Sequence, residues 1–281
     1  MNTRSGNSNE YKVRNTFIDL GYLSEPFYAT NFDIKRKEFI NRELDFFSWK
    51  IATKHFKKKK VLRNYEDVTI LYRVVFIGDY KYIIEENDCF FVGLLDHGLG
   101  KNSNSMNFVM MLFRYVTMFD GSFLNEEIKK FGDFDIPFCS QILTYKSDGK
   151  RIEGKKSKFN LFNFCEQVIS GYKAYRNGST NYILAEKTII LPIIVFGNNI
   201  TFLSGFPEDV SQNRLEKANG LLYRFVSPNV SKDLSLPIFL TDLTSLKSVI
   251  LSIEGFLEGY FQFKLARLKP GDATINIALN F

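Results

Sequence analysis

The sequence predicts an α/β fold, in which strands and helices alternate along one chain. Two observations lead to this prediction. Short runs rich in β-branched and aromatic residues are typical of strands, and segments with apolar residues at helical spacing lie between them. Hydrophobic residues make up 45% of the 281 positions, enough to bury a sizeable core. Because no internal repeat or long linker divides the chain, we expect a single domain over residues 1–281.

The first predicted element is a helix from Glu10 to Leu20. Its apolar residues recur at the spacing of one helix face. Ser8 or Asn9 is the expected N-cap, and Gly21 is the expected stop signal.

Two strands are predicted next, and we expect them to form a hairpin-like pair. In the string RELDFFSWKIA, from Arg42 to Ala52, the alternation places Leu44 and Phe46 on one face and Asp45 on the other. The lysine-rich segment 54–63 is predicted to be an exposed turn. The run from Val68 to Ile84 has the β-branched and aromatic content of a long central strand.

Residues 85–157 show no clean period, so we interpret them as an elaboration of unknown shape. Within them only Phe108 to Phe119 has the character of a helix. A second helix is predicted from Lys158 to Arg176. It is followed by a buried strand from Thr188 to Phe196 and, after a turn, by Ile200 to Leu203.

The last part of the chain predicts two strands and a helix. The strands are Leu221 to Val226 and Leu236 to Leu240. The helix runs from about Asp242 to Tyr260, with Thr241 as the expected N-cap.

Charge and cysteine content limit the classes of partner and compartment. The net charge of +6 is compatible with a polyanionic partner. Cys89, Cys139 and Cys165 are odd in number and form no CxxC pair, which favours a reducing, cytoplasmic setting. No stretch reaches the ~20 apolar residues of a spanning helix, so no membrane partner is expected.

Charged residues gather at the end of the second predicted strand. Asp79 and Lys81 are two residues apart, so on a strand both project from one face. Asp45 on the neighbouring strand would add a second carboxylate, and Glu10 in the first helix a third. Such oxygen ligands suit Mg²⁺ or Mn²⁺, and a nearby cation suits the charged transition state of phosphodiester hydrolysis. The opposing interpretation is a solvated strand end with a weak ion pair.

These residues resemble the restriction-endonuclease-like, or PD-(D/E)xK, nuclease superfamily. Its pattern is a helix bearing Glu, a strand bearing Asp, a neighbouring strand ending in (D/E)xK, and then a helix and a further strand. Glu10 matches the helix position, and Asp45 in RELDF matches the first acid. Asp79 and Lys81 in GDYKY match the second acid and the lysine. Gln167 in FCEQVISGYKAY lies where some members carry a Gln.

The resemblance implies both a fold and a set of roles. The fold would be a restriction-endonuclease-like core, a central mixed β-sheet flanked by helices, with an insertion after the DxK strand. Asp45 and Asp79, with Glu10 as a third ligand, would bind Mg²⁺ or Mn²⁺. Lys81 would orient or activate water, and Gln167 would belong to the same catalytic group.

A basic run lies between the two predicted strands. It comprises Lys54, Lys57, Lys58, Lys59 and Lys60. These lysines could contact phosphates, which would add salt-sensitive affinity without sequence information. A solvated hairpin tip is the equally open interpretation.

Together these features predict a metal-dependent endonuclease that hydrolyses DNA, more than RNA, in a restriction or genome-defence setting. A homodimer would suit double-strand cleavage. One alternative is a nuclease-like domain without catalysis that serves as a nucleic-acid-binding or assembly module. Another is an unrelated α/β scaffold in which Asp45 and Asp79 are separate surface residues.

Overall fold

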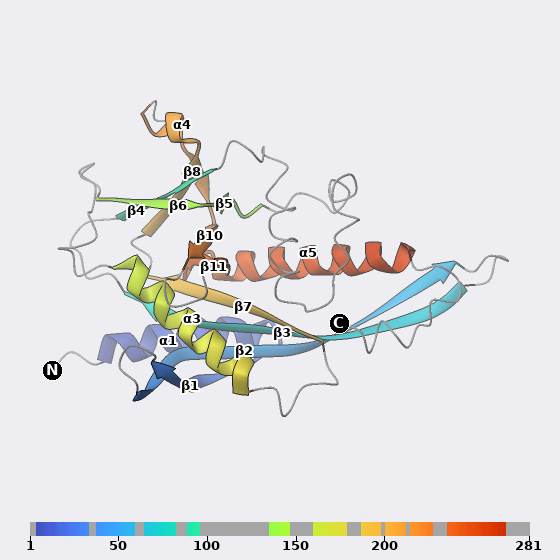
Figure 1. The fold of residues 1–281 in the computed structure, drawn as a ribbon. Helices are drawn as coiled ribbons and strands as arrows, with labels where there is room; N and C mark the ends of the chain where they lie inside the picture. The colour runs from blue at the N-terminus through green and yellow to red at the C-terminus, as the bar shows by residue number, and fades with distance from the viewer. Residues whose placement is uncertain are drawn as a thin grey trace.

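The computed structural model describes residues 4–33, 38–59, 65–82, 89–95, 135–146, 160–178, 187–197, 200–211, 214–226 and 235–267. Within them the chain forms two β-sheets, with helices packed against the larger one (Figure 1). The predicted α/β class is confirmed. The helix predicted from Phe108 to Phe119 lies outside the described residues.

The larger sheet is mixed and has seven strands. Its order is β1 (Leu23–Asp33), β2 (Glu38–Lys59), β3 (Tyr65–Lys81), β7 (Lys187–Phe196), β11 (Ser235–Asp242), β10 (Gly220–Val226) and β5 (Phe138–Cys139). The first three strands form an antiparallel meander, whereas β3, β7 and β11 run parallel. The parallel strands therefore occupy the middle of the sheet, where both faces are covered.

The smaller sheet has four strands, in the order β6 (Gln141–Lys146), β4 (Cys89–Leu94), β8 (Ile200–Gly205) and β9 (Glu216–Ala218). β4 and β6 come from residues 85–157, whose shape the sequence did not predict. β4 pairs in parallel with β8, so this stretch returns to the strand that follows β7. A short helix, α4 (Pro207–Ser211), follows β8.

Helices cover both faces of the larger sheet. On one face α1 (Arg4–Asp19) and α5 (Leu246–Arg267) pack on a core cluster that includes Phe46 and Phe76. On the other face α3 (Leu161–Gly178) and the smaller sheet pack on a cluster that includes Leu44 and Ile77. Full burial of each such side chain contributes roughly 1.5–3 kcal/mol. None of the helices in the described part of the chain is long and apolar enough to span a membrane.

The predicted end of α1 is confirmed, but its predicted start is wrong. The helix begins at Arg4, so neither Ser8 nor Asn9 is its N-cap. At the other end Gly21 has a φ of 82°, and its N–H donates to the carbonyl of Ile18 at 2.9 Å. This left-handed residue satisfies a terminal carbonyl and stops the helix, as a C-terminal glycine does.

Asp242, rather than the predicted Thr241, caps the turn that leads into α5. The Asp242 carboxylate accepts the N–H of Ser245 at 2.8 Å and its hydroxyl at 2.9 Å, and the helix begins at Leu246. Thr241 lies in β11, where its hydroxyl donates to the carbonyl of Asn219 at 2.9 Å. The cap was misplaced because both residues are good N-caps and only the strand end distinguishes them.

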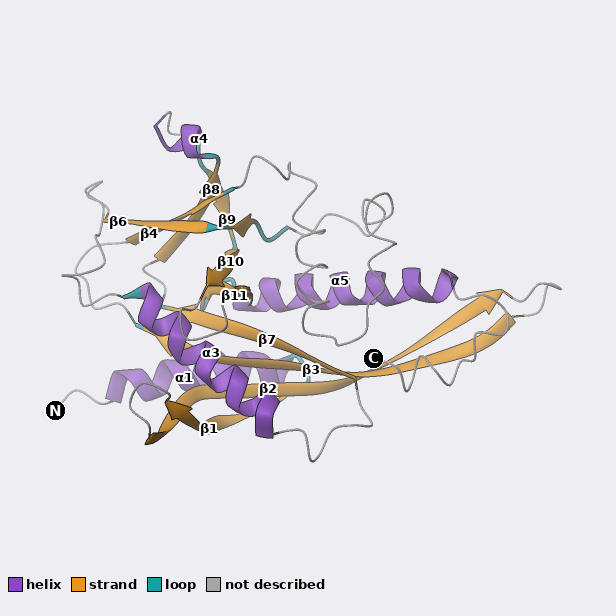
Figure 2. Cartoon of the chain, viewed as in Figure 1, coloured by secondary structure: helices purple, strands orange, loops and turns teal. Residues whose placement is uncertain are grey.

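The predicted antiparallel pair of strands is confirmed as β2 and β3, but the predicted turn is too long. Residues 54–59 continue β2 and pair with β3, and residues 60–63 of the predicted turn lie outside the described residues. β7 pairs with β3 only from Tyr72 onward, and β1 pairs with β2 only as far as Trp49. Residues 53–59 and 65–71 thus form a two-stranded extension, the β2–β3 ribbon, which projects beyond the sheet (Figure 2).

Candidate active site

A bulge in β2 places the first predicted acid. Pro26 of β1 faces two residues of β2, Asp45 and Phe46, because the register shifts at this point. As a result Leu44 packs in the α3 cluster and Phe46 in the α1 cluster, although they are two residues apart. The predicted common face for Leu44 and Phe46 is therefore wrong. Bulges re-aim side chains in this way, and this one lies at the acid itself.

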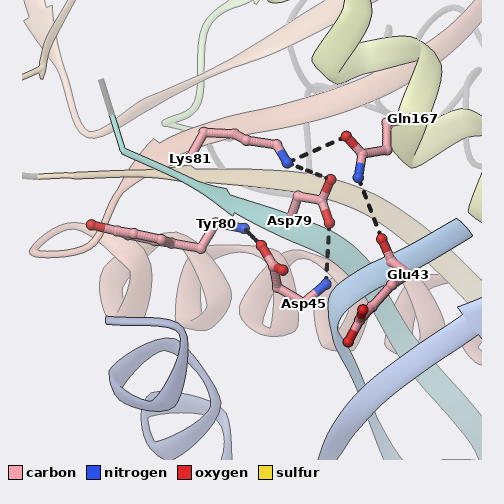
Figure 3. Close-up of polar contacts among 6 residues, drawn as sticks. All are labelled: Glu43, Asp45, Asp79, Tyr80, Lys81 and Gln167. Carbon is pink, nitrogen blue, oxygen red and sulfur yellow. Dashed lines mark hydrogen bonds and ion pairs between the residues drawn. The ribbon is translucent and has the colours of Figure 1, made fainter. Parts of the chain in front are cut away.

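Asp45 and Asp79 are joined by reciprocal hydrogen bonds between the two strands. The N–H of Asp45 donates to Oδ1 of Asp79 at 3.1 Å. The N–H of Tyr80 donates to Oδ2 of Asp45 at 2.7 Å. Each carboxylate thus accepts a main-chain donor of the opposite strand, just beyond the pair Phe46–Gly78 (Figure 3). The two acids consequently lie side by side at the end of the β2–β3 ladder.

Lys81 lies on the other side of Asp79, beneath α3. Its Nζ is 2.9 Å from Oδ2 of Asp79, whose side chain is fully buried. It also donates to Oε1 of Gln167 at 3.3 Å and lies 5.4 Å from the ring centroid of Phe164 (Figure 3 shows the polar contacts). A carboxylate, an amide oxygen and an aromatic ring therefore position the ammonium group.

Gln167 connects α3 to both strands of the pair. While its oxygen faces Lys81, its Nε2 donates to the carbonyl of Glu43 at 3.3 Å. The two contacts agree on the orientation of the amide, since an ammonium needs an acceptor and a carbonyl needs a donor. The Glu43 carboxylate instead accepts the Tyr28 hydroxyl at 3.0 Å.

Electrostatics at the site favour a nearby cation. Burial raises the pKa of Asp45 to about 6, and the charge of Asp79 adds to the increase. Burial also raises the pKa of Asp79, although Lys81 opposes this. Glu10 has a raised pKa as well, first through burial and then through Asp45. The charge of Lys81 alone does not cancel the effects of burial and of the neighbouring acids, because all three carboxyl groups still hold their protons more tightly than in water.

Glu10 is close enough to raise the pKa of Asp79 and to respond to the charge of Asp45, although it comes from a different element. It belongs to α1, on the sheet face opposite α3, whereas Lys81 and Gln167 lie toward α3. Among the described residues no group of three or more His, Cys, Asp or Glu side chains is arranged to hold a metal ion. The structure therefore brings together Asp45 and Asp79, without Glu10 as a third carboxylate in one group.

Three contributors to the site were not predicted from the sequence. They are the N–H of Tyr80, the ring of Phe164 and the carbonyl of Glu43. A sequence gives no signal for hydrogen bonds of main-chain groups, because every residue carries such groups. Phe164 had a detectable signal, since it precedes Gln167 by three residues and shares its helix face.

The predicted basic run is remote from the acids. Lys54, Lys57, Lys58 and Lys59 lie on the β2–β3 ribbon, and Lys60 lies outside the described residues. Lys54 is nine positions from Asp45, or about 30 Å along a strand. Two of the lysines stand opposite acids in the register, since Lys57 pairs with Asp67 and Lys58 with Glu66.

Comparisons with protein-family models, with curated protein sequences and with solved structures found no match to this chain. The functional argument therefore depends on the geometry of the site itself.

Proposed function

We propose that this protein is a divalent-metal-dependent nuclease that hydrolyses phosphodiester bonds in DNA, with a restriction-endonuclease-like core. The observation that supports it most is the single cluster formed by Asp45, Asp79 and Lys81 at the end of the β2–β3 ladder. Two adjacent carboxylates and one fixed ammonium are the groups that metal-assisted phosphodiester hydrolysis requires.

The donor set fits Mg²⁺ or Mn²⁺. Mg²⁺ is commonly held by only one or two carboxylates, with water and substrate phosphate completing its octahedral shell. Asp45 and Asp79 are such a pair, and a divalent cation beside them would offset the burial and the repulsion from Asp79 that raise the pKa of Asp45. Hard oxygen ligands also suit these cations better than softer metals.

The roles of the residues follow from their contacts. A bound Mg²⁺ would supply a Lewis acid and an acidified water. Lys81 would place its charge next to the scissile phosphate, where negative charge develops in the transition state. Gln167 would hold Lys81 in this orientation, because its oxygen accepts from Nζ while its nitrogen is fixed by the Glu43 carbonyl. The β2–β3 ribbon and the net charge of +6 would assist binding to a polyanion.

The test is nicking of supercoiled plasmid in Mg²⁺, in Mn²⁺ and in EDTA, combined with Mn²⁺ binding by calorimetry. Asp79→Asn should abolish nicking and weaken Mn²⁺ binding, because an anionic ligand is lost. Lys81→Met should retain Mn²⁺ binding while lowering the nicking rate by ~10² or more, since its charge acts on the transition state.

Lys247→Met is the matched control. Lys247 is an exposed lysine on α5, so its loss should leave nicking unchanged. Wild-type protein that binds duplex DNA but does not nick it with either metal would favour the non-catalytic binding module instead. Normal nicking by Lys81→Met, alongside an inactive Asp79→Asn, would show that another cation supports catalysis.

A further inference from the structure

Arg14 of α1 is a cation without a bonded partner in the described part of the chain. Its side chain is partly covered, and its Nε atom is buried without a hydrogen-bond acceptor. No hydrogen bond or ion pair among the described residues engages its guanidinium group. A buried donor without an acceptor is costly, and folded proteins satisfy the great majority of such groups. An anionic ligand would complete this side chain.

Helix geometry carries the charge of Arg14 toward the acid pair. Arg14 follows Glu10 by four residues in α1, so the two side chains lie one above the other, ~6 Å apart along the helix axis. Side chains of a helix lean toward its N-terminus, which brings the guanidinium back toward the turn of Glu10. In agreement with this position, the charge of Arg14 opposes the rise in the pKa of Glu10 that burial and Asp45 cause.

The turn of α1 that contains Glu10 is fixed at the acid pair. The side chain of Asn9 forms a hydrogen bond with the Tyr80 hydroxyl. The N–H of the same tyrosine donates to the Asp45 carboxylate at 2.7 Å. This part of α1 is therefore bonded to the strand residue that also holds the first acid. Arg14 stands one helical turn further along α1.

We propose that Arg14 binds a backbone phosphate of the substrate strand next to the scissile phosphate, an inference that rests on the proposed function. Lys81 faces the acid pair from the α3 side of the sheet and Arg14 stands on the α1 side, so a strand that crosses the pair passes both cations. A guanidinium presents a planar fork of N–H donors that matches two oxygens of one phosphate. The ligand class is therefore the phosphodiester backbone itself, whatever its base sequence.

The experiment measures binding, so it does not depend on cleavage. The probe is a fluorescently labelled DNA duplex in EDTA, titrated at several salt concentrations. Each phosphate contact contributes about −0.9 to the slope of log affinity against log salt, so Arg14→Gln should reduce the magnitude of the slope by ~0.9. Its affinity at low salt should fall roughly tenfold. Arg14→Lys keeps the charge but not the fork, so it should restore the slope and only part of the affinity.

Arg224→Gln is the matched control, because Arg224 is an exposed arginine on β10 and its loss removes the same charge. Its slope should stay close to that of the wild type. A second readout is the nicking reaction, in which Arg14→Gln should raise KM and leave kcat nearly unchanged. A contact with a phosphate that does not react is made equally in the ground state and in the transition state. Circular dichroism and urea unfolding verify that each variant is folded.

Several results would overturn the inference. These are a wild-type protein that does not bind the duplex, an unchanged slope in Arg14→Gln, and equal decreases in Arg14→Gln and Arg224→Gln. A lower free energy of unfolding with an unchanged slope would assign Arg14 to a helix ion pair with Glu10. If the slope falls as expected but no metal supports nicking, the phosphate contact stands and the proposed hydrolysis fails. If nicking occurs and Arg14→Gln keeps the wild-type slope, the reverse holds.

Discussion

The buried acid pair sets the properties of the site at the scale of single residues. Asp45 and Asp79 carry like charges beside each other in a mostly buried setting, which is costly without a cation. Their main-chain hydrogen bonds and Lys81 offset only part of this cost. An arrangement that weakens the fold at neutral pH is typical of a functional site rather than of a structural ion pair.

This arrangement predicts that Asp45→Asn stabilises the protein in EDTA at pH 7. The pKa of Asp45 is raised in the folded state from 3.8 to about 6, so the native protein keeps a proton that the unfolded chain releases. Stability from this group is therefore complete below pH 3.8 and is lost as the pH rises toward about 6. The neutral amide avoids this loss, which amounts to at most ~3 kcal/mol.

Urea unfolding across this pH range measures the effect. Asp45→Asn should match the wild type near pH 3.5 and exceed its free energy of unfolding at pH 7, because Asn can still accept the N–H of Tyr80. Saturating Mn²⁺ should stabilise the wild type and not the variant. A variant that is less stable than the wild type in EDTA at pH 7 would contradict the assigned cost of ionising Asp45.

At the scale of elements, strands were predicted better than their irregularities. β7 was recognised as a continuous apolar run, and β2 and β3 by their residue types. β1 was not predicted, because LSEPFYATNFD contains Pro26 and does not alternate. The bulge at Asp45 depends on the register between β1 and β2, which no local pattern reports.

In the candidate site, the features that depend on local spacing were predictable, and those that depend on packing were not. The spacing of Asp79 and Lys81 follows from the strand period, so their common face was predictable. The match with Gln167 came from a family pattern, and the structure does bring Gln167 to Lys81. The position of Glu10 relative to the pair could not be predicted, since it depends on which face of the sheet α1 covers.

The junction between β3 and β7 carries a prediction at this scale. Gly78 lies directly before Asp79, and a Cβ there would overlap the carbonyl oxygen of Ile193 and approach Cζ of Phe46 to 2.8 Å. Gly78→Ala must therefore push β3 away from β7. We expect a loss of ~1–3 kcal/mol in the free energy of unfolding, and with it a loss of Mn²⁺ binding as Asp79 moves.

Gly255→Ala in α5 is the control for this substitution. No atom lies within 4 Å of a Cβ at Gly255, and alanine is the better helix former by ~1 kcal/mol. The two Gly→Ala variants should therefore shift the urea midpoint in opposite directions. Equal shifts would mean that the close approach of β3 and β7 does not constrain position 78.

At the scale of the whole molecule, the β2–β3 ribbon would extend the reach of the proposed site. It carries Lys54, Lys57, Lys58 and Lys59 away from the acids, on a two-stranded element that fits the width of the DNA major groove. The acids opposite Lys57 and Lys58 in the register reduce its net charge. A contribution to DNA binding should therefore be measurable but moderate.

The last prediction concerns the salt dependence of duplex binding when Lys57, Lys58 and Lys59 are all replaced by Ala. Each phosphate contact contributes about −0.9 to the slope of log affinity against log salt. Loss of three full contacts would reduce the magnitude of the slope by ~2.7, and because Asp67 and Glu66 face Lys57 and Lys58 in the register we expect a change of ~1–2. The loss should be the same for unrelated duplex sequences, because phosphate contacts do not read bases.

A variant of equal net charge separates the ribbon from the general charge of the molecule. Lys217, Arg224 and Lys247 are exposed cations on β9, β10 and α5, and their joint replacement by Ala also removes three positive charges. Long-range attraction alone would reduce the magnitude of the salt slope equally in the two variants, since it depends on net charge. A larger decrease in the ribbon variant would mean that the ribbon touches the duplex while the acid pair, about 40 Å from Lys57 along β2, acts on another part of the same strand.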